Sequence, residues 1–370
     1  MRLALTARRV TSASIGARLA RVSQIRDLPS SKRVPLVGVI DMENKEGTVY
    51  TTTSVAEEIE QRELLGIANV VFTGAASMDE IDDSLSQNLE AVLLRRCSFA
   101  SKELARLPHL KCVIRMGAGY DNVDLAACRE KGVIVSNCPD AWVEEVADSS
   151  LSLLLALVRQ TFALSRFVAD GGGWTRQAEL PRRGIRRLRG MRLGLVGLGR
   201  IGTAVAVRAK AFGMSVGFYD PHLQPGIEKG LGGLSRAASF EELLSQSDAV
   251  SFHCPLTPET RHMLNEDTLR ACGGDGIFVV NAARGSVVDE TALLHALTSG
   301  RVRGAALDVL STEPLVPQAL IDAQRSGANL VITPHAAFYS DEAFEEMRHI
   351  AAREVRRILQ GQPPHYQVNR

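Results

Sequence analysis

The sequence has few cysteines, and they form no recognisable framework. Six cysteines are widely spaced between Cys97 and Cys272, and no C-x-x-C pair occurs among them. This spacing argues against a disulfide scaffold and against a zinc site, and it favours a reducing compartment. We therefore expect no bound metal.

The sequence also lacks an excess of charge and a long apolar run. Lys and Arg total 43 against 42 for Asp and Glu, which leaves a formal net charge of +1. Such a balance gives no global field that would attract a polyanion. No apolar run is long enough to cross a bilayer. We therefore expect a protein that binds neither nucleic acid directly nor a membrane.

Acidic residues are missing from the N-terminal leader, residues 1–31, until Asp27. Six arginines precede this first acid, with apolar side chains scattered between them. The composition is typical of an organelle transit peptide, although a disordered basic arm has the same composition. The leader leaves the compartment open between mitochondrion and cytoplasm.

The rest of the chain alternates short apolar runs with helix-length segments, which predicts parallel βαβ units. A length of 370 residues favours two domains. We predict an α/β fold with two doubly wound parallel-sheet domains of the Rossmann or flavodoxin type and a cleft between them. The expected strands are 34–41, 69–72, 90–95, 112–116 and 133–136 in the first domain, and 193–196, 215–219, 249–252, 277–280, 305–309 and 330–333 in the second.

One long helix is expected between the two series of strands. Asp140 is its candidate N-cap, a pair of glutamates follows where the helix dipole favours acids, and the apolar stretch continues to about Ala169 before "GGG". A helix of this length that is apolar on several faces is expected to pack between the domains. Trp142 and Trp174 are expected in the core or at a domain contact.

The clearest motif is "GLGRIG", which follows the first strand of the second series. Gly197, Gly199 and Gly202 suit a tight turn that brings backbone amides to a pyrophosphate at a helix N-terminus. Asp220 ends the next strand, where it can accept hydrogen bonds from ribose hydroxyls and repel a 2′-phosphate. The motif predicts a dinucleotide site that prefers NAD to NADP, whereas a lone glycine motif could be a structural turn.

Four polar side chains follow later strands, at the edge where ligands bind in a doubly wound sheet. They are Arg284, Asp308, Glu313 and His335. Arginine can hold a substrate carboxylate, histidine can give a proton to a developing alkoxide, and a carboxylate can orient that histidine. We therefore predict hydride exchange between nicotinamide and a carbon that bears oxygen. The other seven histidines are expected on the surface or in the core.

A glycine-rich loop also follows a strand of the first domain, in "IRMGAGYDNVD". Its glycines expose backbone amides that suit a substrate carboxylate, although a plain glycine turn has the same sequence. We expect this loop to contact the substrate.

Together these motifs resemble the D-isomer-specific 2-hydroxyacid dehydrogenases. "MGAGYDNVD", "GLGRIG", "NAARGSVVDE", "GAALDV", "TEP" and "TPH" occur in that family's order between about Arg33 and the C-terminus. The resemblance implies a catalytic set of Arg284, Glu313 and His335, NAD as the cofactor, and a homodimer. It also implies a substrate domain of residues 32–140 and 340–370, interrupted by an NAD-binding Rossmann domain of residues 141–339.

Within the family, the sequence most resembles that of the C-terminal-binding protein corepressors, for example in "AVRAKAFGMSVGFYDPHLQPGIE" and "TPHAAFYS". Those corepressors carry a tryptophan three residues after the catalytic histidine, where this chain has Phe338, so we expect a different substrate preference. Their peptide-binding groove forms near the first strand, where this chain continues with the polar segment "MENKEGTVYTTT".

The motifs and the resemblance together give a full set of expected ligand contacts. The cofactor-binding residues are Gly197, Gly199, Arg200, Ile201, Gly202, Asp220, Cys254, Thr260, Ala282, Asp308 and His335. The substrate-binding residues are Arg115, Gly117, Ala118, Gly119, Arg284 and Phe338.

Two functions fit these features. The first is an NAD-dependent oxidoreductase that transfers a hydride to or from C2 of a 2-keto or 2-hydroxy acid with D-isomer specificity. The alternative is an NAD(H)-sensing scaffold of the corepressor type, which binds short partner peptides, retains slow or vestigial activity and is expected in the nucleus. The complete catalytic set and the basic leader favour the enzyme.

Overall fold

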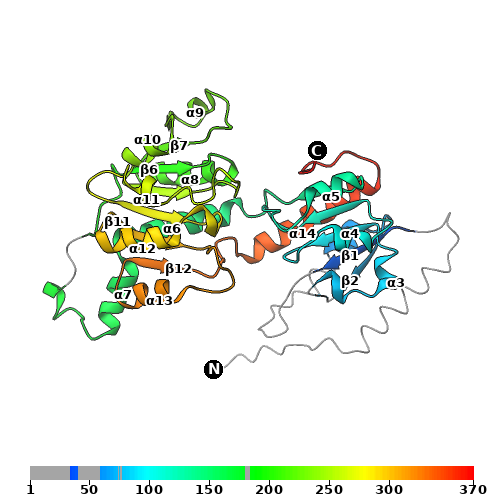
Figure 1. The fold of residues 1–370 in the computed structure, drawn as a ribbon, viewed down its shortest axis with the longest axis horizontal. Coiled ribbons are helices and arrows are strands. Elements are labelled where there is room, and N and C mark those ends of the chain that lie inside the picture. Colours follow the sequence, from blue (N-terminus) through cyan, green and yellow to red (C-terminus); the bar gives the residue numbers. More distant parts are fainter. Residues whose placement is uncertain (1–33, 41–58, 74, 76, 180–183) are drawn as a thin grey trace. The chain divides into compact units, whose positions relative to one another are not determined.

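The computed structural model describes residues 34–40, 59–73, 75, 77–179 and 184–370. These residues belong to two compact units (Figure 1). Unit 1 contains Met1–Trp142 and Ser340–Arg370, and unit 2 contains Val143–Tyr339. The N-terminal leader and the polar segment after the first strand lie outside the described residues.

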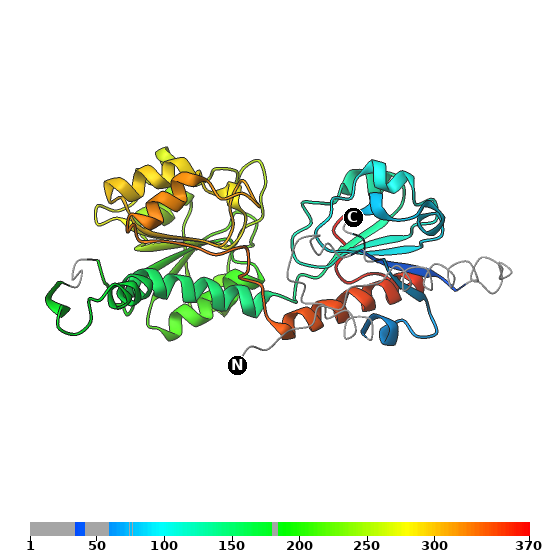
Figure 2. The ribbon, with the colours of Figure 1, turned by 90° about the horizontal axis from the view of Figure 1, so that it is seen from below.

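Unit 1 is built on a five-stranded parallel sheet in the order β2-β1-β3-β4-β5. The strands are β1 (Leu36–Ile40), β2 (Asn69–Phe72), β3 (Ala91–Leu94), β4 (Cys112–Arg115) and β5 (Ile134–Asn137). The three central strands are almost entirely buried, because helices cover both faces of the sheet. Figure 2 shows α14 (Asp341–Leu359) on one face, and α4 (Ser101–Ala105) and α5 (Leu125–Glu130) on the other.

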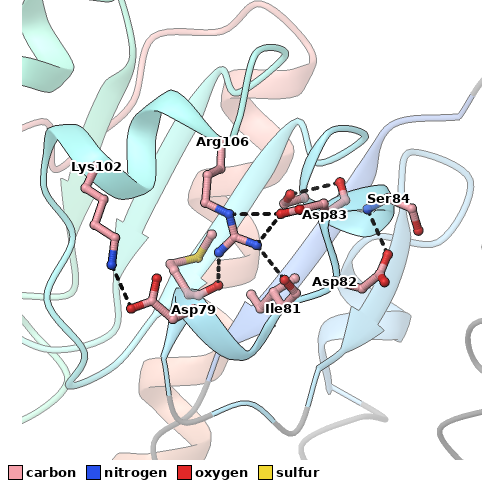
Figure 3. Close-up of polar contacts among 9 residues, drawn as sticks. Asp79, Ile81, Asp82, Asp83, Ser84, Lys102 and Arg106 are labelled. Carbon is pink, nitrogen blue, oxygen red and sulfur yellow. Dashed lines mark hydrogen bonds and ion pairs between the residues drawn. The ribbon is translucent and has the colours of Figure 1, made fainter.

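A small polar network holds the segment between β2 and β3 of unit 1 (Figure 3). The segment contains the 3-10 turn η2 (Met78–Glu80) and the short helix α3 (Asp83–Ser86). The Arg106 guanidinium, just after α4, donates to the carbonyl of Ile81 at 2.6 Å and to Asp83 at 2.7 Å. Because the guanidinium is a planar fork, it fixes both groups in one geometry. Lys102 adds an exposed ion pair with Asp79, which stabilises the segment little.

The C-terminal tail of unit 1 continues beyond α14 and packs beside β5. Gln367 forms an antiparallel bridge with Ser136. Tyr366 donates a hydrogen bond from its hydroxyl to the Asp140 carboxylate at 2.6 Å. The prediction that Asp140 caps a helix is therefore wrong, because its carboxylate binds the tail and the helix begins only at Val143.

Unit 2 is built on a seven-stranded parallel sheet in the order β12-β11-β10-β9-β6-β7-β8. The strands are β6 (Arg192–Val196), β7 (Ser215–Tyr219), β8 (Ser235–Arg236), β9 (Ala249–Phe252), β10 (Ile277–Asn281), β11 (Val302–Leu307) and β12 (Leu330–Ile332). The strand order reverses between β6 and β9, the point at which doubly wound sheets bind ligands. The two parallel sheets confirm the predicted fold class, although the two-residue strand β8 is absent from the prediction.

Helices cover both faces of the unit 2 sheet, with α6 and α8 on one face and α12 and α13 on the other (Figure 2). The helices are α6 (Val143–Arg159), α7 (Thr161–Ala169), α8 (Arg200–Ala211), α9 (Ile227–Gly230), α10 (Phe240–Ser245), α11 (Glu266–Leu269), α12 (Glu290–Ser299) and α13 (Gln318–Arg325), with 3-10 turns η3 (Gln177–Glu179) and η4 (Gly285–Val287). The prediction of one helix up to Ala169 is wrong. Gln160 adopts a left-handed backbone, φ +51°, and α7 leaves α6 at an angle of 60°.

No single helix in the described part of the chain is long and apolar enough to span a membrane, and only the bent pair of α6 and α7 meets that test together, by length and composition alone.

The two tryptophans differ in burial. Trp142 is buried in unit 1, where its ring meets Phe344 edge-on at 5.3 Å. Trp174 in unit 2 is 84% exposed, so the expected core position is wrong for it, and the alternative of a domain contact stays a prediction.

Candidate active site

The "GLGRIG" turn joins β6 to α8 at the carboxyl edge of the unit 2 sheet. Gly197 has a φ of +89°, and a Cβ there would lie 2.8 Å from the carbonyl oxygen of His253. A Cβ on Gly202 would lie 2.2 Å from the carbonyl oxygen of Gly197, whereas Gly199 has open space at that place. Only glycine fits at Gly197 and Gly202. The turn therefore packs directly on the sheet and presents the α8 N-terminus, which suits a phosphate.

Asp220 follows β7 and lies next to this turn. One carboxylate oxygen accepts a hydrogen bond from the Leu198 amide at 3.0 Å, and the other accepts one from the His222 amide at 3.0 Å. Backbone donors of two loops therefore hold the half-buried carboxylate in place. Each oxygen has a second lone pair with which it can accept a hydrogen bond from a ribose hydroxyl.

The remaining predicted cofactor residues occupy the same edge of unit 2. Arg200 and Ile201 begin α8. Burial raises the pKa of the Cys254 thiol, just after β9, to about 11, so this cysteine is a neutral thiol near pH 7. The Thr260 hydroxyl donates to a carbonyl of the β9–α11 loop at 2.7 Å and closes that loop. Ala282 follows β10 directly.

Arg284 lies in a tight loop after β10, and a buried asparagine shapes that loop. Asn281 is fully buried, donates from its side chain to the Arg284 carbonyl at 2.9 Å, and accepts from the amide two residues on at 3.1 Å. A Cβ on Gly285 would lie only 1.9 Å from the carbonyl carbon of Leu310. The Arg284 loop is therefore fixed at its base and packed against the loop that carries Glu313.

Glu313 and His335 form a hydrogen-bonded pair beside this arginine. His335 Nδ1 lies 2.8 Å from one Glu313 oxygen, and the other oxygen accepts from the Leu310 amide at 2.9 Å. Burial acts to raise the pKa of the Glu313 carboxyl. The hydrogen bonds from His335 and Leu310 and the charges of His335 and Arg284 outweigh it and hold the pKa below its ordinary value. Glu313 is therefore an anion near pH 7 that orients the imidazole and leaves Nε2 as the nitrogen available to a substrate.

Asp308 is buried and holds the loop that carries His335. One carboxylate oxygen accepts from the Thr333 hydroxyl at 2.6 Å and from the Ala336 amide at 2.9 Å, and the other accepts from the Ala337 amide at 3.0 Å. The Asp308 carbonyl accepts from the His335 amide at 2.8 Å. These bonds hold His335 at a φ of +52°, a left-handed conformation that few residues other than glycine adopt. Asp308, predicted as a cofactor contact, thus has a positioning role toward His335 in this geometry.

Phe338 lies beside the imidazole. Its ring centroid is 6.0 Å from that of His335, with the planes at 79°. This edge-on arrangement gives His335 an apolar neighbour on one side, which suits the side chain of an organic acid.

In unit 1, the predicted substrate loop follows β4. Gly117 has a φ of +144°, and a Cβ there would lie 1.5 Å from Nη1 of Arg115. The Arg115 guanidinium therefore occupies the space that a side chain at Gly117 would take. The Asn137 side chain donates to the Ala118 carbonyl at 2.7 Å, which ties the loop to the end of β5 just before Gly119.

Sequence reasoning missed Asn281 and Thr333. Both are polar residues at the carboxyl ends of apolar strand runs, "IFVVN" and "LVIT". A buried polar side chain needs a partner, and at that edge of a parallel sheet the partner lies in a site loop. That signal was available in the sequence.

Comparison with known proteins bears on the family. The family model for the NAD binding domain of the D-isomer specific 2-hydroxyacid dehydrogenases matches residues 151–337. The chain belongs to this family. The predicted resemblance is thereby confirmed, and unit 2 contains the family's NAD-binding domain.

Two relatives match over most of this dehydrogenase-family chain. C-terminal-binding protein 1 of Caenorhabditis elegans is 35% identical over 342 residues, which cover 91% of this chain and 44% of that protein. The chain thus spans less than half the length of that relative. Glyoxylate reductase of Korarchaeum cryptofilum is 38% identical over 262 residues, which cover 71% of this chain and 77% of that protein.

Solved structures of the family share the fold. D-mandelate dehydrogenase of Rhodotorula graminis is similar with a TM-score of 0.77 and 27% identity, over 90% of this chain and 98% of that one. The NADPH-dependent glyoxylate/hydroxypyruvate reductase of Sinorhizobium meliloti is similar with a TM-score of 0.75 and 28% identity, over 90% and 96% of the two chains. These two structural relatives are named for different substrates, and the second uses NADPH.

Proposed function

We propose that this protein is an NAD-dependent dehydrogenase that transfers a hydride between nicotinamide and C2 of a 2-keto or 2-hydroxy acid, with D-isomer specificity. The observation that carries the proposal is the His335–Glu313 pair at 2.8 Å, within range of the charge of Arg284. A fold that only binds a dinucleotide does not need an oriented histidine beside an arginine.

Arg284 binds the substrate carboxylate in this proposal. Its guanidinium is always charged and offers two parallel N–H groups, which match the two oxygens of a carboxylate. Since Asn281 and Gly285 fix the backbone on both sides of Arg284, the bound carboxylate positions C2 and its oxygen reproducibly. Arg284 thereby lowers the entropic cost of alignment.

His335 moves the proton. In reduction, Nε2 donates a proton to the oxygen on C2 as that oxygen gains negative charge, and in oxidation Nε2 takes the proton back. Glu313 holds the imidazole in place through Nδ1. Asp308 fixes the backbone on which this alignment depends.

The nucleotide edge of unit 2 fits NAD. The close approach at Gly197 and Gly202 leaves no room for side chains between the turn and the sheet, and Asp220 presents acceptors where a ribose would lie. NADH supplies the hydride when it is bound. In unit 1, the Gly117–Gly119 loop and Arg115 are proposed as further contacts for the anionic substrate, and Phe338 of unit 2 as a contact for its side chain.

We also propose that the protein forms a homodimer through α7. In the described part of the chain, α7 has no buried residue, and Phe162, Val168 and the following Trp174 are exposed. Neighbouring exposed apolar side chains of this size mark an interaction surface, and a second copy of the chain is the partner that the family resemblance implies. Sedimentation should give a dimer for the parent and a smaller species for Trp174→Ser combined with Phe162→Ser.

A second candidate function is a scaffold that binds partner peptides when NAD(H) is present. The observation that favours it is the 35% identity over 342 residues to C-terminal-binding protein 1. Cofactor bound to one conformation stabilises that conformation by mass action and could control a peptide site. This scaffold would bind NADH tightly and reduce keto acids only feebly.

The test is NADH oxidation, followed by absorbance, across a panel of 2-keto acids from glyoxylate to branched and aromatic ones. The dehydrogenase proposal expects a kcat/KM on the order of 10⁴ M⁻¹s⁻¹ or better for at least one acid, with the D-hydroxy acid as product. Tight NADH binding with uniformly feeble turnover would favour the scaffold. Failure to bind NADH would contradict both functions.

A further inference from the structure

Arg236 on β8 holds the loop that begins with Asp220. The β8 strand pairs with β7, so Arg236 lies opposite Phe218, two residues before Asp220. One guanidinium nitrogen donates to the carbonyls of Asp220 at 3.3 Å and Leu223 at 3.2 Å, and another donates to the carbonyl of Gln224 at 3.0 Å. The guanidinium also stacks 4.8 Å from the centroid of the Phe218 ring. A single side chain therefore fixes the first five residues of the loop.

Glu228 closes the same loop and gives the guanidinium its only carboxylate partner among the described residues. Its carboxylate accepts from Arg236 at 3.2 Å and from the Gly226 amide at 3.1 Å. Gly226 has a φ of +99°, which glycine adopts readily. Its own backbone amide and the Arg236 guanidinium hold the pKa of the Glu228 carboxyl below its ordinary value. Glu228 is therefore an anion near pH 7.

This arrangement matters for the choice of cofactor because NADP differs from NAD only by a 2′-phosphate on the ribose that Asp220 would bind. A phosphate there meets the Asp220 carboxylate and, next to it, a guanidinium whose two terminal nitrogens already bind loop carbonyls and Glu228, while its Nε is buried without a partner among the described residues. Arginine is the side chain best suited to a phosphate. Here the arginine binds the backbone of Asp220, the residue proposed to bind the ribose, but is already paired with an internal acid.

We propose that Glu228 and Arg236 are a second determinant of cofactor choice: Arg236 holds the loop that presents Asp220 to NAD, and Glu228, by pairing with Arg236, prevents it from binding the 2′-phosphate of NADP. This inference rests on the proposed use of the unit 2 edge as a nucleotide site. Arg236 is a positioning residue for NAD; loss of the Glu228 charge releases it toward the 2′-phosphate in part, and loss of both acids does so most fully.

The test measures the Kd of NADH and of NADPH for the purified full chain by titration calorimetry. Asp220→Ser should weaken NADH about tenfold or more through loss of a charge-assisted acceptor, while NADPH stays weak because Glu228 still holds Arg236. Adding Glu228→Gln, which keeps an acceptor for the Gly226 amide, should tighten NADPH about tenfold relative to Asp220→Ser alone.

Two controls separate this role from a general effect of charge or folding. Asp220→Ser with Glu241→Gln removes an exposed acid of α10 that is not paired with Arg236, and it should leave the NADPH Kd of Asp220→Ser unchanged. Adding Arg236→Gln to the Asp220→Ser/Glu228→Gln protein should abolish the NADPH gain, whereas Arg236→Lys should restore part of it. Thermal unfolding of every variant checks that the loop changes leave unit 2 folded.

The outcomes are distinct. The inference is overturned if the double variant gains no affinity for NADPH, or if that gain survives Arg236→Gln. In either case, NADH binding by the parent leaves the proposed function standing. A parent that binds neither nucleotide contradicts the proposed function itself. If the double variant does not fold, Glu228→Gln alone decides, since it should lower the ratio of the NADPH Kd to the NADH Kd about threefold, and an unchanged ratio overturns the inference.

Discussion

The carboxyl edges of the two sheets are built in different ways. In unit 2, the buried polar residues Asn281 and Asp308 hold the loops of Arg284 and His335 through several hydrogen bonds each. In unit 1, the Gly117–Gly119 loop is held by a single buried polar side chain, Asn137, which donates to the Ala118 carbonyl, and by the space that Gly117 leaves for the Arg115 guanidinium. The edge that carries the proposed proton donor thus has more buried hydrogen bonds to its loops, as expected where alignment errors of about 1 Å are costly.

The largest expected effect comes from replacing Arg284, the proposed ligand of the substrate carboxylate in unit 2. Arg284→Gln removes the guanidinium and should lower kcat/KM for the preferred keto acid about 10³-fold, through loss of the bidentate carboxylate contact. Arg284→Lys keeps the charge without the fork and should fall between this variant and the parent. Steady-state kinetics with NADH titration would check this, and the NADH Kd should stay within about twofold. Equal loss in NADH binding would show that Arg284 acts on the cofactor instead.

The next effect concerns Asp308, whose buried carboxylate holds the loop of His335. Asp308→Asn replaces one acceptor oxygen with a donor that faces the Thr333 hydroxyl or a backbone amide, so we expect kcat to fall about 10- to 100-fold and unfolding to cost about 1–3 kcal/mol less. Kinetics and denaturant unfolding measure the two quantities. Asp289→Asn is the matched control, because Asp289 caps α12 and asparagine caps equally well. Full activity in Asp308→Asn would contradict the positioning role.

Much of both edges could be predicted from the sequence. Buried parallel strands are continuous apolar runs, so the strands and the residues after them, such as Arg284 and His335, could be placed. The break at Gln160 could not, because no glycine or proline marks it. The brace by Asp308 was also hidden, since its partners are mainly backbone amides of a loop 28 and 29 residues away, and only the folded chain brings them together.

A buried histidine of unit 2 makes the free energy of unfolding depend on pH. His253, just after β9, has Nε2 2.9 Å from the Ser251 hydroxyl, and burial lowers its pKa to about 4. The unfolded chain binds a proton at an ordinary pKa of about 6.5, so between that pH and about 4 it gains a proton that the folded chain lacks. The unfolding free energy should therefore fall by about 2 kcal/mol from pH 7 to 4.5 on account of this residue.

Denaturant unfolding of the parent and of His253→Gln at the two pH values measures this contribution. The variant should lose less stability on acidification than the parent, because glutamine does not titrate. An equal loss of unfolding free energy between the two pH values in both proteins would show that His253 is not held neutral in the folded state. The comparison also reports on the packing under the glycine turn, since a Cβ at Gly202 would lie 3.7 Å from the His253 Cβ.

The smallest expected effect lies in unit 1. Gly117→Ala introduces a Cβ where the Arg115 guanidinium lies and strains a φ of +144°, so the side chain of Arg115 must move. We expect the KM for the keto acid to rise about tenfold while the NADH Kd is unchanged, since the change is confined to the substrate loop. A loss of NADH binding would place this loop on the cofactor instead of the substrate.

The most direct test of the central claim is a pre-steady-state measurement of NADH oxidation by His335→Ala beside the parent, with the NADH Kd determined for both. His335 is proposed as the proton donor, so the chemical step should slow by about 10²–10⁴-fold while the NADH Kd stays within about twofold. A chemical step as fast as that of the parent would contradict the account, because the proton would then come from another group and the His335–Glu313 pair would have only a structural role.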